Sequence, residues 1–140
     1  MALGELIIED KGKIIGQRVL DVEGPKIENS FVMDGKYKGA EGTDIGTYSS
    51  VLRQEEGGGW VMYGEGQGVV TTKDGQEMAT WTGQGIGKFS SPGKISFRGS
   101  LFFRTNSKNG KLSFLNNLVD VFEYEVDEMG NCSSKVWQWK

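Results

Sequence analysis

Apolar and polar residues alternate along most of this chain, in short runs separated by glycine-containing turns. A period of two is typical of β-strands that bury one face. The pattern predicts strands over residues 13–22, 26–37, 45–54, 60–72, 77–89, 94–104, 118–127 and 132–139. Asp34-Gly35 is a candidate turn inside the second run, and no helical period is convincing. Short consecutive strands without crossover helices favour an all-β fold, a single eight-stranded antiparallel meander barrel spanning residues 1–140.

Two of the predicted strands carry glycine at every second position. Asp74-Gly75 between them is typical of a tight hairpin turn, and a two-residue turn pairs Gly66 with Gly83 and Gly64 with Gly85. A three-residue turn at residues 91–93 would then pair Gly87 with Phe97. All these glycines therefore lie on one face of the sheet: Gly64, Gly66, Gly68, Gly83, Gly85 and Gly87.

The glycine face also carries large apolar side chains, whereas the opposite face is mainly polar. We expect the apolar face to point into the barrel, because burial of about ten large apolar side chains outweighs the preference of any turn. Two interpretations stay open for the glycines. They let a small barrel bend and make room for large rings, or they leave a cavity for an apolar ligand. In the second case the predicted ligand-binding residues are Trp60, Met62, Trp81, Phe89, Phe97 and Phe103.

Composition agrees with an all-β protein and narrows the partners. The chain has 22 glycines, 2 prolines and 36% hydrophobic residues, too much glycine for a helical protein and too apolar for a disordered one. Its net charge is −3 with acidic and basic residues intermixed, which disfavours nucleic acid as a partner. No run approaches the roughly 18 apolar residues of a membrane helix. The acidic N-terminal residues lack the pattern of an export signal, and Cys132 has no disulfide partner, so we expect a cytoplasmic protein.

Several classes of chemistry are excluded by the residues that are missing. The chain has no histidine, which removes serine–histidine and cysteine–histidine nucleophile systems and the commonest metal ligand. The lone Cys132 also excludes thiolate zinc sites. The Asp-Gly pairs lack calcium-loop spacing, and the GEGQG and TGQGIG segments lie within strands rather than at the start of a helix. We therefore expect neither a metal nor a cofactor.

Carboxylates in the middle of strands are the remaining candidates for chemistry. Glu65 lies within the glycine strip and is the candidate catalytic residue if its side chain enters the lumen. The hairpin register places it on the outer, polar face, where a charged side chain is ordinarily solvated. Glu65 is thus a weak candidate.

The segment TGQGIGKF, followed by Ser-Pro-Gly and KISFRG, resembles small proteins of the allene-oxide-cyclase-like barrel group. The surrounding GEGQGVVTTKDG, FEYEVDEMGN and KVWQWK segments are similar to uncharacterised prokaryotic members of that group. The resemblance covers roughly the last 80 residues. It implies a calycin-like eight-stranded barrel with an apolar lumen, often as a homo-oligomer. The polar lumen residues of the enzyme that names the group have no counterpart motif in the first half of this chain.

Three functions follow as alternatives. The first is a barrel that binds a small apolar or amphipathic ligand. The second is a cyclase or isomerase type of enzyme, in which a shaped cavity and one carboxylate such as Glu65 suffice. The third is a structural, oligomer-forming barrel without a ligand. Trp137 and Trp139 face the same way, and we expect them in the core if the last strand pairs with the first, or in an oligomer contact if it does not.

Overall fold

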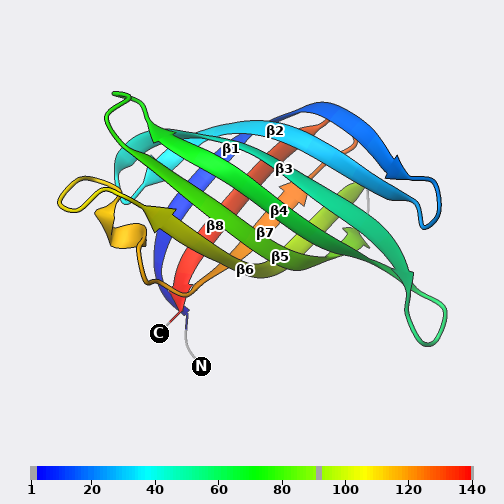
Figure 1. The fold of residues 1–140 in the computed structure, drawn as a ribbon. Helices are drawn as coiled ribbons and strands as arrows, with labels where there is room; N and C mark the ends of the chain where they lie inside the picture. Colours follow the sequence, from blue (N-terminus) through cyan, green and yellow to red (C-terminus); the bar gives the residue numbers. More distant parts are fainter. Residues whose placement is uncertain (1–2, 91–92, 140) are drawn as a thin grey trace.

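The strands of this protein follow one another around a closed barrel (Figure 1). The computed structural model describes residues 3–90 and 93–139. Each strand pairs antiparallel with the next, and β8 pairs with β1 to close the sheet. The predicted all-β, eight-stranded antiparallel meander barrel is confirmed. The strands are β1 (Leu3–Asp21), β2 (Lys26–Tyr37), β3 (Ala40–Gln54), β4 (Trp60–Thr72), β5 (Met78–Ser90), β6 (Lys94–Thr105), β7 (Asp120–Val126) and β8 (Asn131–Trp139).

The glycine hairpin of β4 and β5 has the predicted register. Gly66 lies opposite Gly83 and Gly64 opposite Gly85. Its turn differs from the prediction, because the Thr72 N–H donates to the Glu77 carbonyl and leaves a loop of residues 73–76 between them. Asp74 rigidifies this loop by accepting hydrogen bonds from the Thr72 hydroxyl and the Gln76 N–H. The four-residue loop has the same midpoint in the sequence as the predicted two-residue turn, so the same residues of β4 and β5 lie opposite each other and the register is unchanged.

The strand after this hairpin also pairs as predicted. Phe89 lies opposite Ile95 and Gly87 opposite Phe97. Gly93 has a φ of +69°, the left-handed conformation expected of the glycine in that turn. The other two residues of the predicted turn, at positions 91 and 92, lie outside the described residues. The face of the sheet that carries the glycines therefore continues across β6, and this face points into the barrel interior.

The first half of the chain departs from the prediction at two places. β1 begins at Leu3, well before the predicted start at residue 13, and pairs with both β2 and β8. Charges at consecutive positions, Glu9, Asp10 and Lys11, conceal the strand pattern. The predicted turn at Asp34-Gly35 is wrong, because β2 runs through both residues and pairs on each side. A side chain at Gly35 would collide with Asp10, so this glycine permits close strand contact.

The long connection between β6 and β7 closes part of one barrel end. It holds one 3-10 turn, η1 (Ser113–Leu115). Leu112 and Leu115 are fully buried. Glu77 fixes this segment by accepting hydrogen bonds from the backbone N–H groups of Lys111 and Leu112. The apolar plug is thereby attached to the polar end of the β4–β5 hairpin.

Side chains alternate across the barrel wall in β8 as elsewhere. Cys132 and Val136 are buried inside, whereas Trp139 is 45% exposed and lies on the outer face with Trp137. The expectation that closure of the barrel would place Trp137 and Trp139 in the core is wrong. Side chains alternate along a strand, so these two point to the side opposite to that of Val136. Among the described residues, no helix is long and apolar enough to cross a membrane.

Candidate ligand site in the barrel lumen

The barrel encloses a cavity of about 80 Å³, and residues from all eight strands line it. Aromatic rings from five of the strands pack together in the lumen, with centroid separations of 5.4 to 6.2 Å. These spacings are typical of packed aromatic pairs. The rings belong to Phe31, Tyr48, Trp81, Phe97 and Tyr124. The lumen is therefore largely filled, and the space that remains is small.

The glycines of β4 and β5 make room for these rings. A Cβ atom at Gly87 would lie 2.6 Å from Cε2 of Phe97, closer than real Cβ contacts. A Cβ atom at Gly68 would overlap the Trp81 indole in the same way. At Gly66 the nearest Trp81 atom would be 3.2 Å away, which is tight but not prohibitive. The interpretation that glycine accommodates large rings thus holds for Gly68 and Gly87, while the cavity reaches Gly64, Gly66, Gly83 and Gly85.

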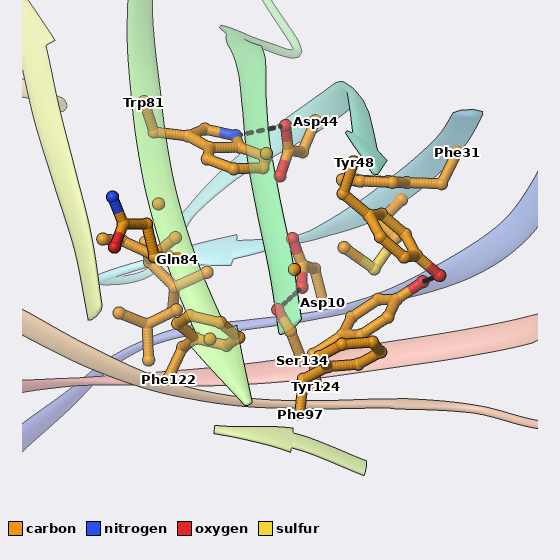
Figure 2. A pocket seen from close by; sticks show the side chains of 18 of the residues that line it. Asp10, Phe31, Asp44, Tyr48, Trp81, Gln84, Phe97, Phe122, Tyr124 and Ser134 are labelled. Atoms are coloured by element: carbon orange, nitrogen blue, oxygen red, sulfur yellow. Dashed lines mark hydrogen bonds between the residues drawn. The ribbon is translucent and has the colours of Figure 1, made fainter. Parts of the chain in front are cut away.

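Asp10 on β1 is the first of two carboxyl groups that line this cavity. It is 3% exposed and accepts hydrogen bonds from the Tyr37 hydroxyl, at 3.2 Å, and from the Ser134 hydroxyl. Burial raises the pKa of Asp10 to about 6, although both hydrogen bonds act to lower it. Closure of β1 against β8 brings Ser134 to this carboxyl (Figure 2).

Asp44 on β3 is the second carboxyl group. It is 6% exposed, and its Oδ1 accepts a 2.8 Å hydrogen bond from the Trp81 indole N–H. Burial raises the pKa of Asp44 to about 7; the indole opposes this, and the nearby Asp10 charge adds to it. Figure 2 shows the carboxyl groups of Asp44 and Asp10 on the same side of the cavity. Two acids with pKa values near neutrality thus share one largely apolar space.

The other titratable groups of the lumen stay neutral at ordinary pH. The hydroxyl groups of Tyr48 and Tyr124 are 3.2 Å apart, and burial raises both pKa values. Burial also raises the pKa of Tyr37 and of the Cys132 thiol. Charge in the lumen is therefore controlled by Asp10 and Asp44.

The predicted ligand-binding residues fall into two groups. Trp81, Phe97 and Phe103 are buried and line the cavity. Met62 is half-buried and packs against the core without lining the cavity. Trp60 and Phe89 are 54% and 56% exposed, so the structure places them away from the cavity. Both lie at strand ends, where the shared face no longer guarantees burial.

Glu65 is exposed, and its side chain accepts a hydrogen bond from the Tyr63 hydroxyl, at 2.9 Å, on the outer face. Its position therefore agrees with the hairpin register and not with a carboxylate in the lumen. Glu65 borders the cavity only because it lies between two glycines, whose lack of side chains leaves a thin wall.

Asp10 and Asp44 did not emerge as candidates from the sequence. Asp10 lies in the stretch that the charge pattern concealed, and Asp44 precedes the predicted start of its strand at residue 45. The sequence does hold a signal for Asp44, because it lies two and four residues before Gly46 and Tyr48 and therefore shares their inward-facing side of the strand. No comparable local signal pairs Asp10 with Ser134, because 124 positions separate them.

A third buried carboxyl, Asp120, lies at the start of β7, outside the cavity lining. Neither of its oxygens has a hydrogen-bond partner among the described residues. Burial raises the pKa of Asp120 to about 6. Across residues 3–90 and 93–139, no three acidic or cysteine side chains gather closely enough to hold a metal ion.

The fold and the lumen define a small closed β-barrel with an aromatic, acid-bearing interior. Solved structures of the same fold include a conserved protein of unknown function from Rhodopseudomonas palustris, with a TM-score of 0.75 and 17% identity over 99% of this chain and 98% of that one. A protein of unknown function from Clostridium acetobutylicum has a TM-score of 0.77 and 15% identity, with 96% of each chain covered. A β-barrel-like protein from Acinetobacter baumannii has a TM-score of 0.73 and 15% identity, over 99% of this chain and 96% of that one.

These likenesses establish the small β-barrel fold of this chain. No protein-family model matches the chain. No curated protein matches it either.

Proposed function

We propose that this protein binds a small molecule in the barrel lumen, one with an apolar body and a polar group. The observation that carries the proposal is a cavity walled by aromatic rings into which two buried carboxyl groups project. Ligand sites commonly combine an apolar lining with a few convergent polar groups. Asp10 and Asp44 are those groups here, and burial raises the pKa of each.

The size of the cavity limits the ligand. About 80 Å³ compares with roughly 150 Å³ for an engineered apolar cavity that binds benzene, so the ligand has only a few heavy atoms unless the rings move. A fatty-acid chain or a terpenoid would displace several packed aromatic side chains. The proposed ligand is accordingly a short, compact molecule.

Tryptophan resonances provide the test. The indole N–H of Trp81 lies in the lumen, whereas Trp60 and Trp139 are exposed and serve as internal controls. Small probes of four to six heavy atoms should shift the Trp81 indole signal saturably in two-dimensional ¹H–¹⁵N spectra and leave the other two unchanged. Absence of any saturable Trp81 shift across such a panel, with no small molecule retained on purification, would overturn the proposal.

A second candidate is an enzyme of the cyclase or isomerase type, as the resemblance to the allene-oxide-cyclase-like group implies. The observation in its favour is the pair Asp10 and Asp44, with pKa values of about 6 and 7, a range suited to proton transfer near neutral pH. A ligand that is recovered chemically changed after incubation would favour the enzyme. Recovery of an unchanged ligand would favour the binding protein.

The alternative of a ligand-free structural barrel is associated with the exposed apolar residues Leu3, Leu6 and Trp139, which lie where β1 and β8 pair. Homo-oligomer formation would use such a surface. Sedimentation at several protein concentrations tests this independently of the lumen. We place the protein in the cytoplasm, since its one cysteine is free and buried. We also propose that it is a single domain, because its strands close one barrel.

A further inference from the structure

We propose that the ligand is a small organic cation, a protonated amine whose ammonium group is held by Asp44 and Asp10 and whose apolar body contacts the aromatic rings. The inference rests on the proposed lumen binding and specifies its chemical class. It is carried by the signs of the charges around the cavity and by one carboxylate oxygen that lacks a partner.

The cavity lining is acidic and carries no compensating cation. Neither lysine nor arginine is among the described residues that line it. No ion pair involving Asp10 or Asp44 occurs within the described part of the chain, where all the pairs lie on the surface. A buried carboxylate is strongly disfavoured unless a cation or several donors accompany it. A protonated amine would supply the missing positive charge, whereas a carboxylate ligand would be repelled.

Asp44 has the capacity to bind such a group. The indole of Trp81 occupies only its Oδ1, and among the described residues nothing donates a hydrogen bond to its Oδ2. In Figure 2 this second oxygen lies on the side of the Asp44 carboxyl group that faces Asp10. Asp44 is 6% exposed as a residue, so little of it contacts bulk water. An ammonium group offers up to three donors and would satisfy it.

The rings of the lumen also favour a cation. Tyr48, Trp81 and Tyr124 present aromatic surface around the space next to the carboxyl groups (Figure 2). The faces of aromatic rings attract organic cations, and this attraction is largest in a site shielded from water. An aromatic wall combined with a carboxylate therefore distinguishes an amine from a neutral molecule of the same shape.

Binding should depend on pH in a defined direction. The titratable groups facing the two acids are Tyr37, Tyr48, Tyr124 and Cys132, all with raised pKa values, and Asp34 adds a further negative charge. None of these becomes positive. Acidification from pH 7.5 to 5.5 lowers the ionised fraction of Asp44 roughly 25-fold and also protonates most of Asp10, so the affinity for an amine should fall at least tenfold.

Three probes that share a branched four-carbon skeleton provide the experiment: isobutylammonium, isobutanol and isobutyrate. Each is titrated into the full-length protein at pH 7.5, with the Trp81 indole signal as the readout. We expect isobutylammonium to bind at least tenfold more tightly than isobutanol, and isobutyrate to bind weakest. The Asp44→Asn variant keeps an amide oxygen for the Trp81 indole but removes the charge, so amine affinity should fall by about tenfold to a hundredfold.

The matched control removes a charge from the outer face. Glu123→Gln lies on β7, with its side chain exposed beside Arg98, and should change amine affinity less than twofold. Cooperative thermal unfolding and a single, well-dispersed Trp81 indole signal in each free variant confirm that both are folded.

The outcomes separate this inference from the proposed function. Equal or tighter binding of isobutanol or isobutyrate overturns the cation and leaves lumen binding standing. Amine binding that survives Asp44→Asn undiminished also overturns it. Absence of a Trp81 response to all three probes, together with a purified protein free of any small molecule, overturns lumen binding itself.

Discussion

Asp44 and Asp120 are both buried carboxyl groups whose pKa values burial raises, yet their surroundings differ. Asp44 faces a cavity in the centre of the lumen and holds the Trp81 indole. Asp120 follows the loop that carries η1, borders no part of that cavity, and has no hydrogen-bond partner among the described residues. A raised pKa alone therefore does not identify a ligand site. The open space and the directed partners at Asp44 are the observations that support the proposed ligand site there.

The largest expected effect is the pH dependence of the unfolding free energy that Asp44 contributes. The pKa of Asp44 is about 7 in the folded state against 3.8 as its ordinary value, so the folded protein holds a proton that the unfolded chain releases in between. The stabilising contribution of Asp44 is consequently greatest at low pH and is lost as pH rises towards 7. From pH 5 to 8, Asp44 alone should remove about 2 to 3 kcal/mol of unfolding free energy.

Urea unfolding at several pH values measures this effect. Asp44→Asn should flatten the profile by that amount, while the slope contributed by Asp10 and Asp120 persists. An unchanged profile in Asp44→Asn would mean that Asp44 ionises normally in the folded protein.

A smaller loss of stability should follow from crowding the Trp81 indole, which donates a hydrogen bond to Asp44. Gly68→Ala adds a methyl group where the indole lies, so it displaces the ring that binds Asp44. We expect a loss of about 1 to 3 kcal/mol in unfolding free energy. Gly16→Ala is the matched control, because no atom of the described residues lies within 4 Å of its Cβ position. A loss in Gly16→Ala equal to that in Gly68→Ala would contradict the packing role of Gly68.

Replacing each carboxyl with valine should give opposite signs. At pH 5, Asp44→Val leaves the buried Trp81 N–H without its acceptor and should destabilise the fold by about 1 to 3 kcal/mol. Asp120→Val removes a buried group that has no partner in the described structure and should stabilise it by about 1 kcal/mol. Denaturant midpoints at fixed pH provide the comparison. The same sign for both variants would erase the distinction between the two regions.

The smallest effect concerns the amine ligand. At ten times its Kd, isobutylammonium should raise the unfolding free energy by about 1.4 kcal/mol at pH 7.5. Asp44→Asn should lose most of this increase, and Asp120→Asn should retain it, because Asp120 lies outside the cavity lining. Thermal unfolding with and without the amine measures both. Equal losses in the two variants would indicate a nonspecific charge effect.

Much of the barrel could be predicted from local sequence. The Asp74-Gly75 turn aligned the glycines of β4 and β5, and alternation then assigned Trp81 and Phe97 to the interior. Such inferences succeed because a hairpin register depends on residues close together in the chain. The same logic kept Glu65 outside.

The acidic side of the lumen could not be predicted in this way. Asp10 acquires Tyr37 and Ser134 as partners only when distant strands close the barrel. Its strand also carries charges on both faces, which hides the alternation. The inward direction of Asp120 could have been predicted, since it shares a face of its strand with Phe122 and Tyr124. Its burial depends on the rest of the fold.

The most direct test of a cation-binding lumen is native mass spectrometry of the protein purified from its host at neutral pH, followed by denaturing release of any bound compound. The account predicts a stoichiometric low-mass amine, retained by Glu123→Gln and lost in Asp44→Asn. A bound carboxylic acid, or a neutral compound indifferent to Asp44→Asn, would contradict it.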